Sequence, residues 1–258
     1  MKKALALTLC LSALILSGCF DVEQTISINQ DLSGKAGFSM TVDMEPMALF
    51  LLYMQRDMEG KTGEPTEAEI EKARQDLLSK ADKPEAKFNK EEVQKELPPG
   101  VTMLESEVKD EGLKLKARFL FGVDKISKLS DLRLETNAGQ PMPGEPQGDE
   151  NPFSQPFSGL VIKDEGDTIL VTTKATNPIA DQKEQADSME TSPEAKKLVE
   201  KAFAGLRFAV KIDAPFEVLE HNATRKEGKT LIWEYDLKAL EKMTPEQMEQ
   251  GVRVRYKK

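Results

Sequence analysis

The chain has 258 residues, with 36 basic and 45 acidic side chains, a net charge of −9 and 39% hydrophobic residues. This length suffices for one large domain or two small ones, and the composition is globular, toward the polar end of that range. The acidic balance excludes a nucleic-acid binder, because neutralising phosphates needs a concentrated basic surface, and one histidine and two cysteines leave little material for catalysis or metal binding.

The N-terminal residues have the layout of a bacterial lipoprotein signal. Two lysines precede an apolar run at 4–16, which is shorter than the roughly 20 residues of a membrane-spanning helix. The run ends in Leu-Ser-Gly-Cys at 16–19, which resembles a lipobox. That resemblance implies that residues 1–18 are removed as a signal peptide and that Cys19 is acylated. The alternative is an ordinary secretory signal with a chance cysteine at its end.

Cleavage at this site changes the composition of the chain. Two lysines and Cys10 are lost, so the mature chain of 240 residues has 34 basic and 45 acidic side chains, a net charge of −11 and no cysteine besides Cys19. Burial, rather than disulfides or thiolate–metal bonds, must then stabilise the domain. Phe20, not aspartate, follows the cysteine, and by resemblance to Gram-negative lipoproteins this favours the outer membrane, facing the periplasm. In a Gram-positive cell the same signal would place the protein on the outer face of the membrane.

Alternation of apolar and polar residues predicts strands along the mature chain. The first hairpin combines 22–28 with 38–44 around a turn at 29–37, where Gly34 and Gly37 can take positive φ. Only about three residues, at roughly 3.3 Å each, separate this hairpin from Cys19, so the domain is expected close to the bilayer. The other strands are expected over 104–108, 113–121, 160–162, 169–173, 206–212, 216–218, 231–235 and 252–256.

Helices are predicted between the strands. The segment 46–58 has Pro46 in its first turn and is apolar on nearly all sides through Met54. A second helix over 66–80 begins with a capping box formed by Thr66 and Glu69. Further helices are expected over 192–203, 237–243 and from 244 onward. The predicted fold is α+β: a mainly antiparallel, twisted sheet of about nine strands with helices packed on one face.

Two polar stretches are predicted loops. The segment 137–156 contains five prolines and three glycines, and 181–191 is acidic. Strands on either side of them must share a sheet to bury their apolar faces. We therefore expect a single lipid-anchored domain over 19–258 with a Pro/Gly-rich loop at 137–156.

Catalytic and metal-binding motifs are scarce. His221 is the only histidine, and without a second histidine or a free thiol a metal site would need unidentified carboxylates. No P-loop, GxGxxG, HExxH or GxSxG motif occurs. The triplet Asn222-Ala223-Thr224 matches a glycosylation acceptor by coincidence in a bacterial lipoprotein. We predict no catalytic residue, cofactor or metal, and a hydrolase using His221 is the third hypothesis for function.

Two features leave alternatives open. The apolar helix is most simply buried on the sheet, but Met-rich surfaces adapt to varied partners, so it could also form a binding surface. Its residues would be Met47, Leu49, Phe50, Leu51, Tyr53 and Met54. The basic row Lys114, Lys116 and Arg118 faces Glu105 and Glu107 of the preceding strand, which favours cross-strand ion pairs, with contact to anionic lipid as the alternative.

Two motifs extend the resemblance. The first hairpin reads I-x-I-N-x-D-x-S-G-x-x-x-F-x-M-x-V over 26–42, and a late segment reads F-x-V-x-x-x-N-A-T followed by L-x-W-x-Y-x-L over 216–237. Together with the lipobox they resemble LppM-type bacterial lipoproteins. This resemblance implies an extracytoplasmic α+β domain without known catalytic residues, in a family with a member linked to binding of mannosylated membrane lipids. The chain departs from that family at 59–100 and 137–156 and lacks a C-terminal transmembrane helix.

The sequence thus predicts a non-catalytic envelope lipoprotein that binds a lipid or an envelope component. Its expected partners are the membrane, through acyl groups on Cys19, and a lipid or envelope protein. The alternative is a structural or assembly factor that binds envelope proteins.

Overall fold

A computed structural model describes residues 19–61, 63–80, 93–95, 97–133, 156–157, 159–173 and 205–258. The predicted signal peptide, the loop predicted at 137–156 up to residue 155, the acidic loop at 181–191 and the helix predicted over 192–203 lie outside these residues.

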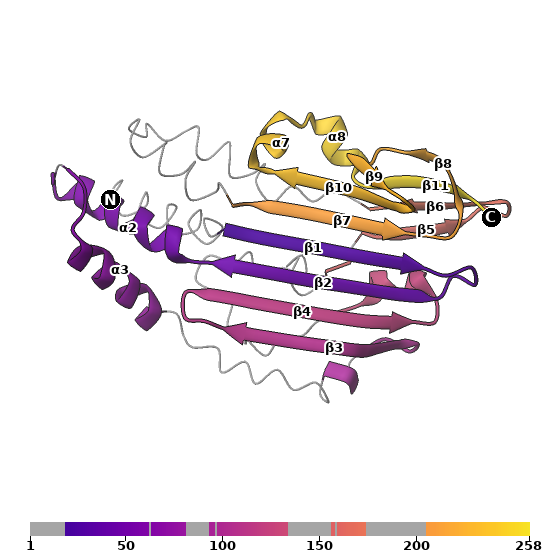
Figure 1. Ribbon diagram of the computed structural model, residues 1–258, viewed down its shortest axis with the longest axis horizontal. Helices are drawn as coiled ribbons and strands as arrows, with labels where there is room; N and C mark the ends of the chain where they lie inside the picture. The colour runs from indigo at the N-terminus through magenta and orange to yellow at the C-terminus, as the bar shows by residue number, and fades with distance from the viewer. Residues whose placement is uncertain are drawn as a thin grey trace, which may run out of the picture.

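Within the described residues the strands form two sheets, one of seven strands and one of four (Figure 1). The main sheet has the order β3 (Val101–Asp110), β4 (Lys114–Val123), β2 (Gly34–Asp43), β1 (Cys19–Ile28), β7 (Arg207–Asp213), β10 (Thr230–Asp236) and β9 (Arg225–Glu227). The second sheet has the order β5 (Val161–Asp164), β6 (Thr168–Thr172), β11 (Arg253–Lys257) and β8 (Glu217–His221).

The fold class is α+β, but the prediction of one mainly antiparallel sheet of about nine strands is wrong. β1 and β7 pair in parallel, from Asp21 opposite Arg207 to Ser27 opposite Asp213, so the main sheet is mixed. The hairpin around 163–167 and the last strand belong to the second sheet instead. Turn signals report only local pairing, and the pairing of β1 with β7 joins segments that are far apart in the sequence.

The core lies between the inward face of the main sheet and the second sheet. Trp233 of β10, Phe121 of β4 and Tyr256 of β11 are fully buried in the same cluster of apolar side chains. A 3₁₀ helix, η1 (Ile126–Asp131), adds Ile126 and Leu129 to this cluster; the sequence patterns did not predict it. Since side chains from both sheets fill one cluster, the two sheets form a single core.

The prediction that the longer helices pack on one face of the sheet is wrong. α2 (Glu45–Met58) follows β2 after a single residue, and the backbone N–H of Met44 donates to the carbonyl of Leu113 at 2.8 Å. This short connection directs the chain past the ends of the strands, where α2 packs against α3 (Glu67–Lys80) (Figure 1). The short helices α7 (Leu237–Lys242) and α8 (Pro245–Gln250) follow β10.

The capping box at the start of α3 is confirmed. The backbone N–H of Thr66 donates to Oε2 of Glu69 at 2.8 Å, and the N–H of Glu69 donates to Oγ1 of Thr66 at 3.3 Å. Thr244 and Gln247 form a second capping box at α8. Side-chain oxygens therefore pair with backbone donors that have no partner inside the helix.

The turn between β1 and β2 differs from the prediction for its glycines. Leu32 is the residue with positive φ, at 63°, whereas Gly34 and Gly37 lie in β2 without positive φ. A Cβ atom on Gly34 would lie 2.0 Å from the carbonyl oxygen of Ser27, and one on Gly37 would lie 2.3 Å from Oγ1 of Thr25. These glycines are needed because β1 approaches closely, and not because of their backbone angles.

Candidate functional site

The predicted anchor and the apolar helix lie at the same end of the main sheet. Cys19 is the first residue of β1, and Asp43, the last residue of β2, is its neighbour across the strands. Asp43 in turn pairs with Lys114, the first residue of β4. The expected spacer of about three residues is therefore absent, and the backbone enters the sheet at Cys19 itself.

Most side chains proposed for the apolar surface of α2 are half-buried. This holds for Leu49, Phe50, Leu51, Tyr53 and Met54, whereas the side chain of Met47 is outside the described part. The most buried face of α2 is formed by other residues, which lie four positions apart. Ala48, Leu52 and Arg56 are 1%, 8% and 9% exposed. Nη1 of Arg56 contacts Oε1 of Glu69 in α3 at 2.7 Å, so this face is turned toward α3. The role of the proposed apolar residues stays a prediction.

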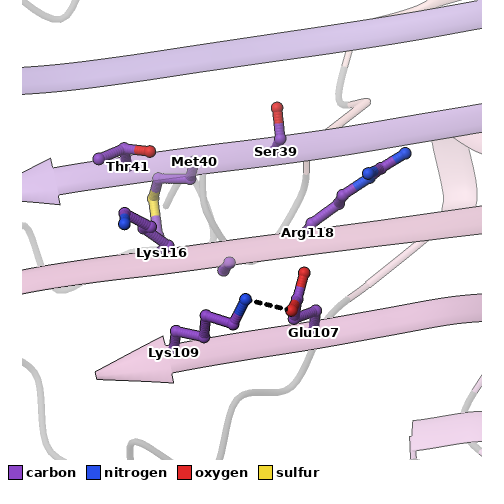
Figure 2. Close-up of a pocket in the computed structure, with 8 residues that line it drawn as sticks. Ser39, Met40, Thr41, Glu107, Lys109, Lys116 and Arg118 are labelled. Atoms are coloured by element: carbon purple, nitrogen blue, oxygen red, sulfur yellow. Dashed lines mark ion pairs between the residues drawn. The ribbon is translucent and has the colours of Figure 1, made fainter. Parts of the chain in front are cut away.

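A hollow with a volume of about 190 Å³ lies on the face of the main sheet that points away from the core (Figure 2). The strands β2, β4 and β3 supply two rows of neighbouring residues across it. Ser39, Arg118 and Glu107 form one row. Thr41, Lys116 and Lys109 form the other, which lies nearer to Cys19.

Among the described residues, the basic row of β4 forms none of the predicted ion pairs with Glu105 or Glu107. Glu107 lies opposite Arg118, but its carboxylate contacts Nζ of Lys109 on its own strand at 2.6 Å. Glu105 lies opposite Leu120, because the register set by the hairpin continues unbroken from Asp110 to Glu105. Of the two acids, only Glu107 thus lies opposite a residue of the basic row.

Charges on β1, β7 and β10 form a network on the same face. Arg207 contacts Glu234 at 2.6 Å, Asp21 at 2.8 Å and Glu23 at 3.1 Å, and Lys211 also contacts Glu23 at 2.9 Å. Partial burial alone would raise the pKa of Glu23, but hydrogen bonds and charges from Lys211 and Arg207 outweigh it and lower that pKa. The hydrogen bond from Arg207 lowers the pKa of Glu234. Paired charges of this kind stabilise the sheet and offer no free group for catalysis.

The hydrolase hypothesis gains no carboxylate partner for His221. The imidazole is exposed, and its Nδ1 accepts a hydrogen bond from the backbone N–H of Ala223 at 3.1 Å. Within the described part of the chain, no carboxylate forms an ion pair with it. In the same residues no group of three or more His, Cys, Asp or Glu side chains could hold a metal ion.

No helix among the residues that the structure describes is both long and apolar enough to cross a bilayer.

Comparison with solved structures finds a weak similarity to a lipoprotein domain. No family model matches the chain, and no curated protein matches it significantly. Among solved structures, the folded domain of LppM from Mycobacterium tuberculosis, determined by NMR, is 10% identical, with a TM-score of 0.42. The similarity covers 93% of this chain and 90% of that domain. No residue role or activity is transferred from this similarity.

Proposed function

We propose that this chain is a lipid-anchored lipoprotein of a bacterial cell envelope that acts by binding a lipid or another envelope component. The acyl groups are attached to Cys19 after removal of residues 1–18. The mature domain faces the periplasm from the outer membrane. It performs no catalysis.

The observation that carries this proposal is that β1 begins at Cys19 itself. A lipid on this side chain leaves no spacer between bilayer and sheet, so the strand ends lie within a few ångströms of the headgroups. α2 continues from β2 at this same end, with half-buried apolar side chains on several sides. Apolar groups next to a bilayer are suited to contact acyl chains or an apolar partner.

The anchor is tested by the mass of the intact protein purified in detergent from bacterial membranes. We expect the mass of residues 19–258 plus the acyl groups, and the unprocessed mass for Cys19→Ser. The matched control is Cys10→Ser, because Cys10 lies in the segment that is removed and its replacement should leave processing and acylation intact. Processing of the Cys19→Ser variant without lipid would indicate an ordinary secretory signal and contradict the proposal. Separation of inner and outer membranes on a density gradient then tests the outer-membrane location.

The binding role is tested by crosslinking in membranes and mass spectrometry of what is recovered. Phe50→Ser should reduce recovery of the bound lipid or protein, since it removes a half-buried aromatic side chain from the side of α2 opposite its most buried face. Leu219→Ser is the control, because Leu219 is 50% exposed and lies in β8 of the second sheet. Recovery of a reproducible protein but no lipid would favour the assembly-factor alternative. Recovery of neither would contradict the binding role.

A further inference from the structure

The hollow on the outer face of the main sheet has a surplus of positive charge in an otherwise acidic protein. Its charged lining consists of Lys109, Lys116 and Arg118 with a single carboxylate, Glu107. Lys114 lies on the same face of β4, two residues before Lys116. The chain as a whole has a net charge of −9, so this local excess of cations runs against the composition.

The register places like charges side by side in this hollow. Lys109 and Lys116 are directly opposite each other on β3 and β4. Such a pair is destabilising unless anions lie close by. Glu107 lies 2.6 Å from Lys109, and Glu111 lies 2.9 Å from Lys116. The positive charges of Lys109 and Lys114 also help to lower the pKa of Glu111, and Nζ of Lys114 lies 3.8 Å from Oδ2 of Asp43. The four cations Lys109, Lys114, Lys116 and Arg118 thus have three acidic neighbours, which leaves an excess of one positive charge.

Three further polar groups of the hollow are available to a ligand. Arg118 makes no hydrogen bond or ion pair within the described residues, and its guanidinium points away from the ion pair of Lys109 and Glu107 (Figure 2). The hydroxyl groups of Ser39 and Thr41, across β2, likewise make no hydrogen bond to a described residue. Guanidinium, ammonium and hydroxyl donors on one surface are the groups that recognise phosphate oxygens.

The hollow is also close to the anchor. Cys19, Asp43 and Lys114 are consecutive cross-strand neighbours, so Lys114 lies about 10 Å from Cys19 at the usual strand spacing. Lys116 and Arg118 follow on the same face at intervals of about 7 Å along β4. The nearer acids on β1, Asp21 and Glu23, are already occupied by Arg207 and Lys211.

We infer that Lys109, Lys114, Lys116 and Arg118 bind the phosphates of anionic lipid headgroups in the bilayer that holds Cys19, and thereby fix the tilt of the sheet on the membrane. The anchor alone leaves the domain free to rotate about one point. These cations turn the outer face of β4 and β3 toward the headgroups. They must come close, because the negative surface potential of the membrane decays within about 8 Å at physiological ionic strength. This inference rests on the proposed lipid anchor at Cys19.

The test uses the protein as the cell processes it, reconstituted into nanodiscs of phosphatidylcholine alone or mixed with phosphatidylglycerol. Exposed lysines are acetylated with a water-soluble amine reagent and quantified by mass spectrometry. Lys109, Lys114 and Lys116 have side chains 57%, 42% and 43% exposed, so each is reactive without lipid. We expect acetylation of these lysines to be roughly fivefold slower in the anionic discs and to recover at high salt.

Lys35 is the internal control, since it is exposed on the same face of β2 but eight residues from Asp43, about 26 Å away. Its reactivity should be equal in both discs. Arg118→Gln should weaken the protection of Lys109 and Lys116 without affecting the fold, because Arg118 has no ion pair to lose within the described residues. Lys35→Gln is the matched variant and should leave the protection unchanged.

Equal reactivity of the three lysines in both discs would overturn the inference while leaving the anchor intact. Protection by inorganic phosphate in neutral discs, without protection by anionic discs, would also overturn it and identify a soluble phosphate as the ligand. Failure of the purified protein to incorporate into either disc would contradict the proposed anchor, and with it the inference.

Discussion

The indole N–H of Trp233 donates a hydrogen bond to Oδ1 of Asn222 at 2.7 Å. Asn222 follows β8 of the second sheet, whereas Trp233 is a fully buried residue of β10 in the main sheet. The same Oδ1 accepts from the backbone N–H of Arg253 at 2.8 Å, and Nδ2 donates to the carbonyl of Gly251 at 2.8 Å. One side chain thus links the two sheets at the point where the chain passes between them.

Replacing Asn222 by Ala should lower the free energy of unfolding by about 1 to 3 kcal/mol, because it leaves the buried N–H of Trp233 without an acceptor. Trp233 is the only tryptophan, so its fluorescence during urea unfolding reports on this site directly. Asn29→Ala is the control, since Asn29 is exposed in the β1–β2 turn and, among the described residues, its side chain donates only to Oγ of Ser33, at 2.9 Å. An equal loss of stability in the two variants would contradict the linking role of Asn222.

The role of residues 222–224 in linking the two sheets could not be predicted from the sequence, where they matched only a glycosylation triplet. Thr224 also bonds across it, donating to the carbonyl of Ile232 at 2.8 Å and accepting from the N–H of Glu234 at 3.1 Å. Alternation of apolar and polar residues did predict most strands. The first-turn proline with an apolar run predicted the helix over 46–58, and the Thr66–Glu69 motif predicted both the helix over 66–80 and its capping box. Patterns of this kind depend on residues within one or two turns of each other.

The contacts that sequence patterns did not predict join strands that are far apart in the chain. Arg207 joins acids of β1 to Glu234 of β10, and its contact with Asp21 spans 186 residues of chain. The cations of β4 were visible as a row, but the alternation pattern did not show that the register of the hairpin places Lys109 opposite Lys116. Periodicity gives the face of each strand and leaves its neighbour undetermined.

Arg207→Gln should reduce the dependence of stability on acid pH. In the folded protein the pKa values of Glu23 and Glu234 are lowered below the ordinary 4.5. Their ionised carboxylates therefore stabilise the fold above pH 4.5, and this stabilisation is lost as the pH falls through their lowered pKa values. The variant should lose about 2 kcal/mol at neutral pH and much less at pH values below those carboxyl pKa values. Urea unfolding at a series of pH values measures this difference. Arg118→Gln is the control on the same face and should alter the profile much less, because Arg118 makes no ion pair in the described part and acts on Glu107 only through its charge. A loss that stays constant with pH would contradict the prediction.

Gly37→Ala should destabilise the protein by about 1 to 3 kcal/mol, because the added methyl group would lie 2.3 Å from Oγ1 of Thr25. The double variant with Thr25→Ala should recover most of this loss, since the nearest atom is then absent. Gly34→Ala should not be rescued in the same way, because its methyl group meets the backbone carbonyl of Ser27. Thermal unfolding of the single and double variants completes the cycle, and additive effects of Gly37→Ala and Thr25→Ala would disprove the contact.

Tyr256→Phe should leave stability unchanged or raise it by about 1 kcal/mol. Tyr256 is fully buried, and its hydroxyl has no hydrogen-bond partner among the described residues. Burial, with a smaller effect from Asp213, raises the pKa of this phenol above the ordinary 10, so the native protein loses stability as the pH rises past 10 and the Phe variant should lose less. Chemical unfolding at neutral and at alkaline pH tests both statements. Tyr53→Phe is the comparison, because it removes a hydrogen bond to Glu64 and should lower stability slightly. A marked loss of stability in Tyr256→Phe would show that the Tyr256 hydroxyl has a hydrogen-bond partner.

The position of β1 inside the sheet determines how the domain responds to mechanical force. β1 lies between β2 and β7, with ten residue pairs on one side and seven on the other. A pull on lipid attached to Cys19 acts along β1 and loads both ladders of hydrogen bonds in shear, all at once, whereas an anchor on an edge strand would let them open one at a time. If Cys19 carries the proposed lipid and the domain holds the proposed partner, β1 should therefore resist tension between membrane and partner without unfolding from its anchored end.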